Sequence, residues 1–215
     1  MISVELQNIG KKFGREWIFR NLNYTIAPGQ KLVILGGNGS GKSTLLQVIC
    51  GFVGVNEGQL VYTSTSGPTP QVVSEEDLRL FVSFSSPYLQ LIEDFTMLEM
   101  IEHAAQFKPF QGGLTSEEVM KIAELSHAAN KPIKQFSSGM KQRLKLALAI
   151  LADTPLLLLD EPVSNLDKAA ITWYREMVES YSKKRTVIVC SNAIEEEYSF
   201  CTKQLMVSDF KLTTL

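Results

Sequence analysis

The sequence contains few of the residues that build disulfide scaffolds or metal centres. Its 215 residues include 3 cysteines, Cys50, Cys190 and Cys201, and no two of them form a CxxC pair. The two histidines, His103 and His127, stand far apart in the chain. Disulfide frameworks need paired cysteines, and metal centres need several ligands close together. We therefore expect reduced core thiols and no histidine-based metal cluster.

An excess of one charge and a long apolar run are also missing. The 21 basic and 23 acidic residues give a net charge of −2, which provides no basic footprint for nucleic acid or for an anionic membrane surface. The longest apolar candidate, LALAILADTPLLLLDEP, is broken by Asp153 and Pro155, so no segment predicts a membrane span. The N-terminal charges follow the apolar residues, unlike those of a signal peptide. We expect a cytoplasmic protein without a nucleic-acid partner.

Hydrophobic residues make up 45% of the chain, which is enough for one domain over residues 1–215. The early segments ISVELQNI and FRNLNYTI alternate apolar and polar residues, as half-buried strands do. The segments KLVILGG, LLLLDEP and TVIVCSN are continuous apolar runs, which are typical of strands buried on both faces. Helical patterns lie between them, in STLLQVICG and from Lys168 to Lys184. The sequence therefore predicts an α/β fold with a mostly parallel core sheet and a small antiparallel β subdomain.

Two further segments complete the predicted organisation. The region of roughly residues 96–152 reads mostly helical and lies between the first and second buried strands. We expect it to form an inserted helical subdomain. The segment YTSTSGPTPQVVSEED, residues 62–77, is polar and rich in turn residues. We interpret it as a loop near the edge of the antiparallel sheet.

A glycine-rich segment after the first buried strand carries the clearest chemical signal. Residues 36–43, GGNGSGKS, fit the phosphate-loop pattern G-x-x-x-x-G-K-[ST]. Its glycines let backbone N–H groups turn toward one anion, and the next helix aims the positive end of its dipole there. Lys42 supplies a charge for the outer phosphates, and Ser43 supplies a hydroxyl ligand for Mg²⁺. The expected nucleotide contacts are Gly36, Gly37, Asn38, Gly39, Ser40, Gly41, Lys42, Ser43 and Thr44.

Two acidic residues end the second buried strand. Asp160 can hold the Mg²⁺ shell, and Glu161 beside it can accept a proton from an attacking water. A nucleotide kinase would also need an arginine-rich lid and a second substrate pocket, and the sequence contains no such lid. A glutamate base placed directly after the strand favours hydrolysis.

A Ser/Gly turn, an amphipathic helix and the acidic strand follow one another in QFSSGMKQRLKLALAILADTPLLLLDEPVSNLD. This order resembles the ATP-binding cassette (ABC) ATPases, and the resemblance covers nearly the whole chain. FSSGM is similar to the family's LSGGQ signature: Ser137 and Gly139 match it, whereas Ser138 and Met140 depart from it. SNLD resembles the D-loop. The resemblance implies a P-loop NTPase fold and an ATPase that uses ATP and Mg²⁺.

The resemblance also implies partners. A helix capped by Ser137 would reach the γ-phosphate bound to the opposite subunit, so two copies would close head to tail around two ATP molecules. A separate transmembrane permease would hold the protein at the inner face of the cell membrane. The short chain and its SSGMKQR form resemble efflux-type subunits. Candidate contacts to the permease are Tyr88, Leu91, Phe95 and Phe107.

The resemblance suggests an aromatic contact for the nucleotide base. Phe13 in KKFG resembles the family residue that stacks on adenine, because a flat ring offers a π-face to any base. A role for Phe13 as core filler remains open, and Trp17 is a competitor for the stacking position.

Two positions depart from the family pattern. Where the family has a glutamine that contacts Mg²⁺, this chain has Ser85 or Ser86, with Gln90 a few residues later. Where the family has a histidine that holds the γ-phosphate, it has Asn192, whose amide can donate a hydrogen bond but carries no charge. We include Asn192 among the catalytic candidates with Lys42 and Glu161. These departures predict slow turnover with ATP binding retained.

Two other functions remain compatible with the sequence. One is a cytosolic ABC ATPase that acts in the assembly of other proteins. The other is a slow-turnover nucleotide switch, which the asparagine at position 192 suggests. The observation that separates a transporter subunit from both is which protein co-purifies from detergent-solubilised membranes.

Overall fold

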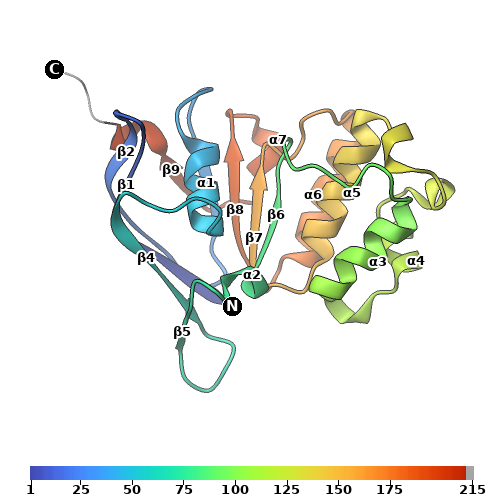
Figure 1. Ribbon diagram of the computed structural model, residues 1–215, viewed down its shortest axis with the longest axis horizontal. Helices are drawn as coiled ribbons and strands as arrows, with labels where there is room; N and C mark the ends of the chain where they lie inside the picture. The colour runs from blue at the N-terminus through green and yellow to red at the C-terminus, as the bar shows by residue number, and fades with distance from the viewer. Residues whose placement is uncertain (212–215) are drawn as a thin grey trace.

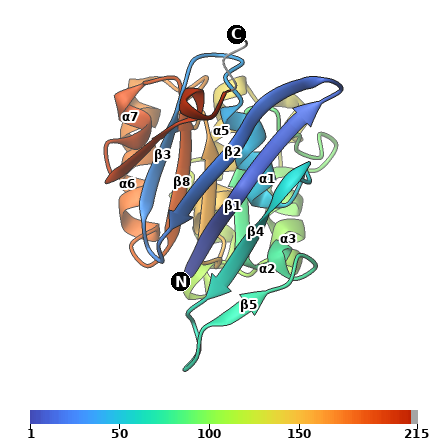
Figure 2. The ribbon, with the colours of Figure 1, turned by 90° about the vertical axis from the view of Figure 1, so that its left-hand side faces the viewer.

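The computed structural model describes residues 1–211, which form two sheets and the helices around them (Figures 1 and 2). The first sheet is antiparallel, with the order β2-β1-β4-β5. Its strands are β1 (Ile2–Phe13), β2 (Glu16–Ile26), β4 (Glu57–Ser64) and β5 (Gln71–Val73). The second is parallel, with the order β6-β7-β8-β3-β9. Its strands are β3 (Lys31–Leu35), β6 (Val82–Ser85), β7 (Leu156–Asp160), β8 (Thr186–Ser191) and β9 (Lys203–Met206).

Helices cover both faces of the parallel sheet. In Figure 1, α1 lies between this sheet and the antiparallel strands, whereas α5 and α6 lie on the other side, with α3 and α4 beyond them. The α-helices are α1 (Lys42–Cys50), α2 (Leu78–Phe81), α3 (Met97–Phe107), α4 (Ser116–Ile122), α5 (Ser138–Leu151), α6 (Lys168–Tyr181) and α7 (Glu195–Tyr198). Short 3₁₀ turns are η1 (Gln111–Gly113), η2 (Ser126–Ala128), η3 (Ile133–Gln135) and η4 (Val207–Phe210).

The parallel sheet divides the hydrophobic core in two, and strand β7 shows how. Leu156 and Leu158 face the core shared with α1 and the antiparallel sheet. Leu157 and Leu159 face the core shared with α5, α6 and the helical region. All four side chains are fully buried, and burying a leucine stabilises the fold by about 1.5–3 kcal/mol. Burial on both faces is therefore the reason that this strand reads as a continuous apolar run.

Local signals set the ends of several helices. Helix α1 ends at Gly51, whose φ of 80° favours glycine and whose N–H donates to the carbonyls of Gln47 and Val48. Helices α3 and α4 begin with capping boxes, in which Thr96 pairs with Glu99 and Thr115 pairs with Glu118. These helices and α5 occupy the region that the sequence predicts to be helical.

Two sequence predictions need correction. Residues 62–77 are not only a loop, because Tyr62, Thr63 and Ser64 complete β4 and pair with the short edge strand β5. Strand β5 has only three residues, and Val72 among them is 73% exposed. It is therefore too short to show the alternation of buried apolar and exposed polar residues that would predict a strand. Helix α6 ends at Tyr181 rather than at Lys184, since the next residue, Ser182, leaves the helical conformation at φ −116° and ψ 8°.

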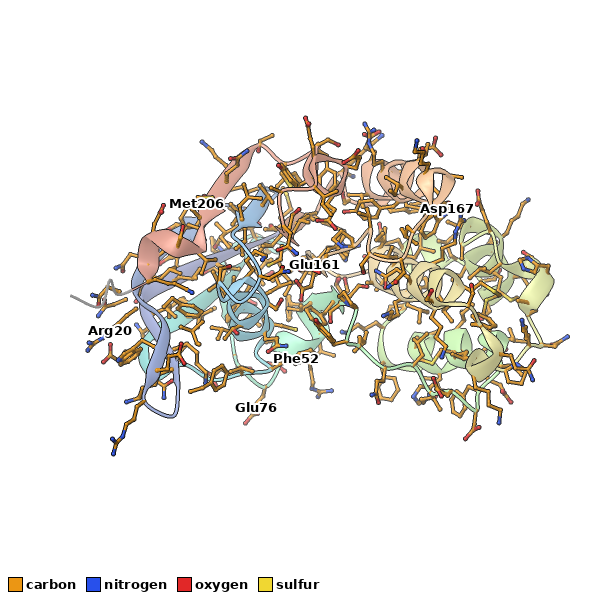
Figure 3. All side chains as sticks on the ribbon, turned by 90° about the horizontal axis from the view of Figure 1, so that it is seen from above. Arg20, Phe52, Glu76, Glu161, Asp167 and Met206 are labelled. Carbon is orange, nitrogen blue, oxygen red and sulfur yellow. The ribbon has the colours of Figure 1, made fainter. Side chains whose placement is uncertain are left out.

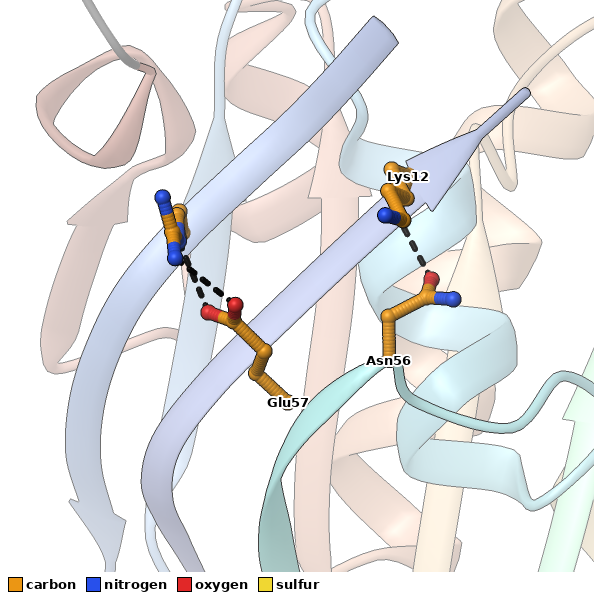
Figure 4. Close-up of polar contacts among 4 residues, drawn as sticks. Lys12, Asn56 and Glu57 are labelled. Atoms are coloured by element: carbon orange, nitrogen blue, oxygen red, sulfur yellow. Dashed lines mark hydrogen bonds and ion pairs between the residues drawn. The ribbon is translucent and has the colours of Figure 1, made fainter. Parts of the chain in front are cut away.

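A cross-strand ion pair joins β2 to β4 across β1 (Figure 4). The Arg20 guanidinium of β2 reaches over β1 and donates twice to the Glu57 carboxylate, at 2.7 Å each. The hydrogen bond from Arg20 lowers the pKa of Glu57. A Cβ at Gly10 of β1 would lie 2.9 Å from the Trp17 ring and 3.2 Å from Glu57. Glycine at position 10 therefore gives these side chains room to cross the sheet.

Candidate active site

The phosphate loop joins β3 to α1, as the sequence predicts. Gly39 and Gly41 adopt φ values of 71° and 103°, a region that residues with a Cβ rarely occupy. At Gly41, which caps α1, a Cβ would also lie 2.4 Å from Cγ2 of Ile18. Ser40 Oγ is buried and has no hydrogen-bond partner among residues 1–211. A buried hydroxyl without a partner, beside backbone N–H groups, fits a loop that receives a phosphate oxygen.

Lys42 is held tightly against this loop. The residue is only 4% exposed, and its ammonium donates to the carbonyls of Gly36 at 2.7 Å and Gly37 at 3.0 Å. Its third hydrogen bond goes to Oδ1 of Asn192, at 2.6 Å. An ammonium group has three N–H donors, so all three are in use. An incoming phosphate must therefore replace at least one of these acceptors.

Ser43 and Asp160 meet at the end of strand β7. The Ser43 hydroxyl donates to Oδ1 of Asp160 at 3.1 Å. Burial raises the pKa of the Asp160 carboxyl, and the hydrogen bond from Ser43 opposes that shift. A hydroxyl and a carboxylate form the all-oxygen donor set that Mg²⁺ prefers. The two side chains thus fit the predicted metal site.

Glu161 follows in an unusual backbone conformation. Its φ is 42°, a left-handed value that costs a residue with a side chain on the order of 1–3 kcal/mol. Its N–H donates to the carbonyl of Cys190 on the neighbouring strand at 3.0 Å, and its Oε1 accepts from Nδ2 of Asn192 at 2.6 Å. Figure 3 places Glu161 near the centre of the molecule. Asn192 therefore contacts both of the other predicted catalytic residues, Lys42 and Glu161.

These side chains line one cavity of about 510 Å³. Its lining residues are Ile18, Asn38, Gly39, Ser40, Gly41, Lys42, Ser43, Thr44, Tyr88, Glu161 and Asn192. Ile18 and Tyr88 were not predicted to lie at the phosphate loop. Tyr88 is 83% exposed, and no sequence pattern marks either residue. The cavity thus brings together residues of the predicted phosphate loop, the predicted metal ligand Ser43 and the predicted base Glu161, whereas Asp160 is buried behind Ser43 and does not line it.

The predicted base-stacking residue stands apart from this cavity. Phe13 ends β1, is 54% exposed and is not among the lining residues. The Lys11 ammonium lies 5.0 Å from the centre of its ring. The competitor Trp17 is half-buried against Gly10, with Lys12 and Arg20 over its ring. Adenine stacking by Phe13 therefore stays a prediction, and Ile18 is the apolar side chain that borders the cavity.

The signature residues are not brought to the phosphate loop within one chain. Ser137 caps α5, and its Oγ accepts from the N–H of Met140 at 3.2 Å, as predicted. Ser137 and Gly139 line a separate cavity of about 340 Å³ with residues of the segment after Glu161, including Asn165 and Asp167. Figure 3 shows Asp167 well away from Glu161. The two cavities share no lining residue.

Ser85 and Ser86, which stand where the family has its glutamine, lie at the end of β6 and directly after it. Ser85 pairs with Leu159 in the register of β6 and β7, and its buried Oγ has no partner among the residues that the structure describes. The Lys145 ammonium of α5 donates to the carbonyls of Ser86 at 3.1 Å and Pro87 at 2.9 Å. Lysine at position 145 thus ties the loop after β6 to the helical region.

The permease contacts predicted from sequence divide into two pairs. Tyr88 and Phe107 are 83% and 64% exposed. Leu91 and Phe95 are half-buried and pack against the helical core, so they offer less exposed surface than the first pair, and their contact with a permease stays a prediction. They are buried because the loop after β6 folds back over α3 and α5. Of the residues considered for metal or disulfide chemistry, His103 packs between the Phe95 and Phe107 rings. The thiols of Cys50, Cys190 and Cys201 form no disulfide among the described residues.

A phosphate loop after one strand of the parallel sheet and an acidic pair at the end of another strand of that sheet, β7, define a P-loop nucleotide-binding protein. The chain belongs to the ABC transporter family, whose model matches residues 19–164. It is therefore an ATP-binding and ATP-hydrolysing subunit of this family, and it uses ATP with Mg²⁺. Among residues 1–211, no helix combines the length and apolar composition needed to cross a membrane.

Several known proteins resemble the chain over most of its length. The lantibiotic transport ATP-binding protein SrtF of Streptococcus pyogenes is 28% identical over 90% of this chain and 81% of its own. The cytochrome c biogenesis ATP-binding export protein CcmA of Brucella abortus is 28% identical over 89% of this chain and 85% of its own. The dimeric cassette MJ0796, solved in a post-hydrolysis state with ADP and phosphate, superposes with a TM-score of 0.80. It is 27% identical, and the match covers 97% of this chain and 95% of that chain.

Proposed function

We propose that this chain powers an exporter, by closing with a second copy around ATP and driving a separate membrane-spanning subunit. The relatives support the direction of transport, since one is named for lantibiotic transport and another for export in cytochrome c biogenesis. A structural neighbour at 27% identity is a dimer with ADP and phosphate bound. Through its membrane partner, the protein would sit on the cytoplasmic face of the cell membrane.

The division of the site into two cavities carries this proposal. One cavity is lined by residues of the phosphate loop and by Glu161, and the other by Ser137 and Gly139 at the start of α5. The free N–H groups at a helix start attract an anion, yet the Ser137 helix start does not border the phosphate cavity of its own chain. In a head-to-tail pair with two-fold symmetry, each signature turn would meet the γ-phosphate held by the other copy.

The geometry suggests a role for each predicted residue. Lys42 and the backbone N–H groups of residues 36–44 would hold the β- and γ-phosphates. Ser43 and Asp160 would hold Mg²⁺, which supplies charge neutralisation at the phosphates. Glu161 would accept the proton of the attacking water, and Asn192 would orient Glu161 through its 2.6 Å hydrogen bond. The assignment of these roles stands as our proposal, with Phe13 as the candidate for base stacking.

A groove beside the helical region is the proposed contact for the membrane subunit. Two adjoining cavities, of about 420 and 250 Å³, share Leu89, Gln90, Leu91 and Lys145 in their lining. Lys108 and Lys145 enter this groove and donate only to backbone carbonyls of the described residues. Burial lowers the pKa of both ammonium groups. Tyr88 and Phe107 add exposed rings nearby.

Affinity purification from solubilised membranes tests the proposed function. A tagged Glu161→Gln protein, chosen to prolong the ATP-bound state, is purified in detergent with MgATP and again with EDTA. We expect one multi-spanning membrane protein in a fixed ratio to the cassette, and we expect its addition to stimulate the ATPase of the unmodified protein. Recovery of an active ATPase with soluble partners alone would instead indicate the assembly function.

Substitution of Ser137 by alanine is expected to weaken ATP-driven pairing. The change removes the cap of α5, which lowers stability by about 1 kcal/mol, and it loosens the helix start that would face the partner's phosphate. In the Glu161→Gln background, light scattering with MgATP should show less dimer, while ATP binding by the monomer persists. Thr115→Ala, which removes a comparable cap from α4, serves as the control and should leave the dimer unchanged.

Replacement of Asn192 by histidine is expected to raise turnover several-fold. A charge-assisted hydrogen bond contributes about 1.5–3 kcal/mol, against about 1 kcal/mol for a neutral one. A gain of about 1 kcal/mol in the transition state corresponds to roughly fivefold in rate. Steady-state ATPase assays of both proteins at saturating MgATP test this expectation, with ATP affinity unchanged. Equal rates, or a slower histidine variant that still dimerises, would show that position 192 does not limit turnover.

A further inference from the structure

Glu197 is a buried carboxyl group behind the active site that the roles above leave unused. It lies on α7 and is 1% exposed. One of its oxygens, Oε1, accepts a hydrogen bond from the N–H of Val163 at 3.3 Å. The other, Oε2, has no partner among residues 1–211. Because a buried carboxyl with an unpaired oxygen destabilises a fold, its presence at this point calls for a role beyond packing.

The contacts of Glu197 join two segments that flank the active site. Val163 comes two residues after Glu161 and begins the segment that leads to the second cavity. The N–H of Glu197 donates to the carbonyl of Ile194 at 3.0 Å, and Ile194 comes two residues after Asn192. Glu197 therefore contacts the backbone on both sides of the contact between Asn192 and Glu161, through its carboxyl at Val163 and through its N–H at Ile194.

Both of these segments depart from relaxed backbone geometry. Glu161 has φ 42°, and Ala193, which follows Asn192, has φ 67°. Residues with a Cβ persist in this region only when surrounding contacts hold them there. The Ser191 hydroxyl accepts from the N–H of Ile194 at 3.1 Å and closes the turn around Ala193. Glu197 is placed to hold this turn and the segment after Glu161 in one arrangement.

Helix α7 is itself anchored. The Tyr174 hydroxyl of α6 donates to the backbone carbonyl of Glu197 at 2.9 Å, and Tyr174 is fully buried. The N–H of Glu197 donates to the carbonyl of Ile194 at 3.0 Å. Burial raises the pKa of the Glu197 carboxyl to about 7, and the charges of Glu161 and Asp160 add to the increase. The Glu197 carboxyl is therefore carried by an anchored helix and lies close enough to Glu161 and Asp160 for their charges to raise its pKa.

We propose that Glu197 is a positioning residue that sets Asn192 against Glu161 and links both to the segment after Glu161. This inference rests on the proposed role of Glu161 as the base. The Asn192 amide donates to Glu161 and accepts from Lys42, at 2.6 Å each. A small displacement of the turn that carries Asn192 would therefore disturb both partners at once. The length of the Glu197 side chain, rather than its charge, is the property that matters for this role.

Two conservative variants separate length from charge. Glu197→Gln keeps the acceptor that faces Val163 and loses the charge. Glu197→Asp keeps the charge and withdraws the acceptor by one methylene. We expect Glu197→Gln to keep kcat within about threefold of the original protein. We expect Glu197→Asp to lower kcat about tenfold or more with KM for ATP unchanged, because a misplacement of about 1 Å can cost on the order of a hundredfold.

The controls separate positioning from a general loss of structure. Glu196→Asp makes the same change at an exposed position of the same helix and should leave kcat unaltered. Nuclear magnetic resonance of the Asn192 side-chain amide gives a readout without turnover. Its signals should move in Glu197→Asp and stay in place in Glu197→Gln and Glu196→Asp. A general loss of packing would instead shift signals across the core and lower the thermal midpoint in proportion to the loss of rate.

The outcomes are distinct from those that test the proposed function. If Glu161→Gln hydrolyses ATP at the original rate, the role of the base fails, and this inference fails with it. If Glu161→Gln is slow and Glu197→Asp is as fast as the original protein, only the positioning role is overturned. A slow Glu197→Gln beside a normal Glu197→Asp would overturn it as well, since charge would then be the property that matters.

Discussion

Replacement of Glu161 by glutamine is expected to slow ATP hydrolysis by about a hundredfold or more, the usual contribution of a general base. Glutamine keeps the shape of the side chain, and its amide oxygen can still accept the hydrogen bond that Asn192 donates at 2.6 Å. What it loses is the ability to take a proton from water. ATP binding, which depends on the phosphate loop, should be unaffected.

The same variant should accumulate as a dimer. If hydrolysis releases the two copies from each other, a protein that binds ATP without hydrolysing it stays closed. Light scattering with saturating MgATP should therefore report a dimer for Glu161→Gln and a monomer for the original protein. Glu179→Gln, at an exposed position of α6, is the matched control and should hydrolyse ATP normally. A Glu161→Gln protein that stays monomeric would contradict the shared site.

Replacement of Lys42 by alanine is expected to weaken ATP binding by at least about a hundredfold. Charge-assisted hydrogen bonds contribute about 1.5–3 kcal/mol each, and 2.7 kcal/mol corresponds to about a hundredfold in affinity. Lys42 is 4% exposed, and its ammonium donates to the carbonyls of Gly36 and Gly37 in the phosphate loop. Its loss leaves the phosphate cradle without a cation at its centre.

Isothermal titration calorimetry with ATP measures this effect. Circular dichroism and the thermal midpoint show whether the variant is folded, since the truncation also removes packed methylene groups. Lys183→Ala removes a lysine at an exposed position before β8 and should bind ATP as the original protein does. Unchanged affinity in a folded Lys42→Ala protein would refute the assignment of residues 36–43 as the phosphate loop.

Much of the site follows from local sequence. The pattern GGNGSGKS after a buried strand and before a helix predicts the phosphate loop, because strand, turn and helix are set by neighbouring residues. Asp160 and Glu161 follow from the same reasoning, since a continuous apolar run predicts a buried strand and its end predicts the sheet edge. The cap of α5 at Ser137 is also a local signal. These features lie where the sequence predicts them.

Contacts between distant segments required the tertiary structure. Asn192 lies 150 residues from Lys42 and 31 from Glu161 along the chain, yet it touches both. The register of β7 and β8, which pairs Asp160 with Cys190, brings the end of β8 to the acidic pair. The family resemblance singled out Asn192, as the residue in the place of the family's histidine after a strand, but only this register shows that its amide bridges Lys42 and Glu161.

The sequence by itself determined the chemistry of the phosphate loop, the acidic strand end and the capped signature helix, because each depends on residues within a few positions of one another. Only the tertiary structure decided that Ile18 borders the cavity while Phe13 stands outside it, and that Glu197 is buried behind the site. These outcomes depend on how the antiparallel sheet and α7 pack against the parallel sheet. Such packing is set by the fit of many distant side chains at once, which no local pattern encodes.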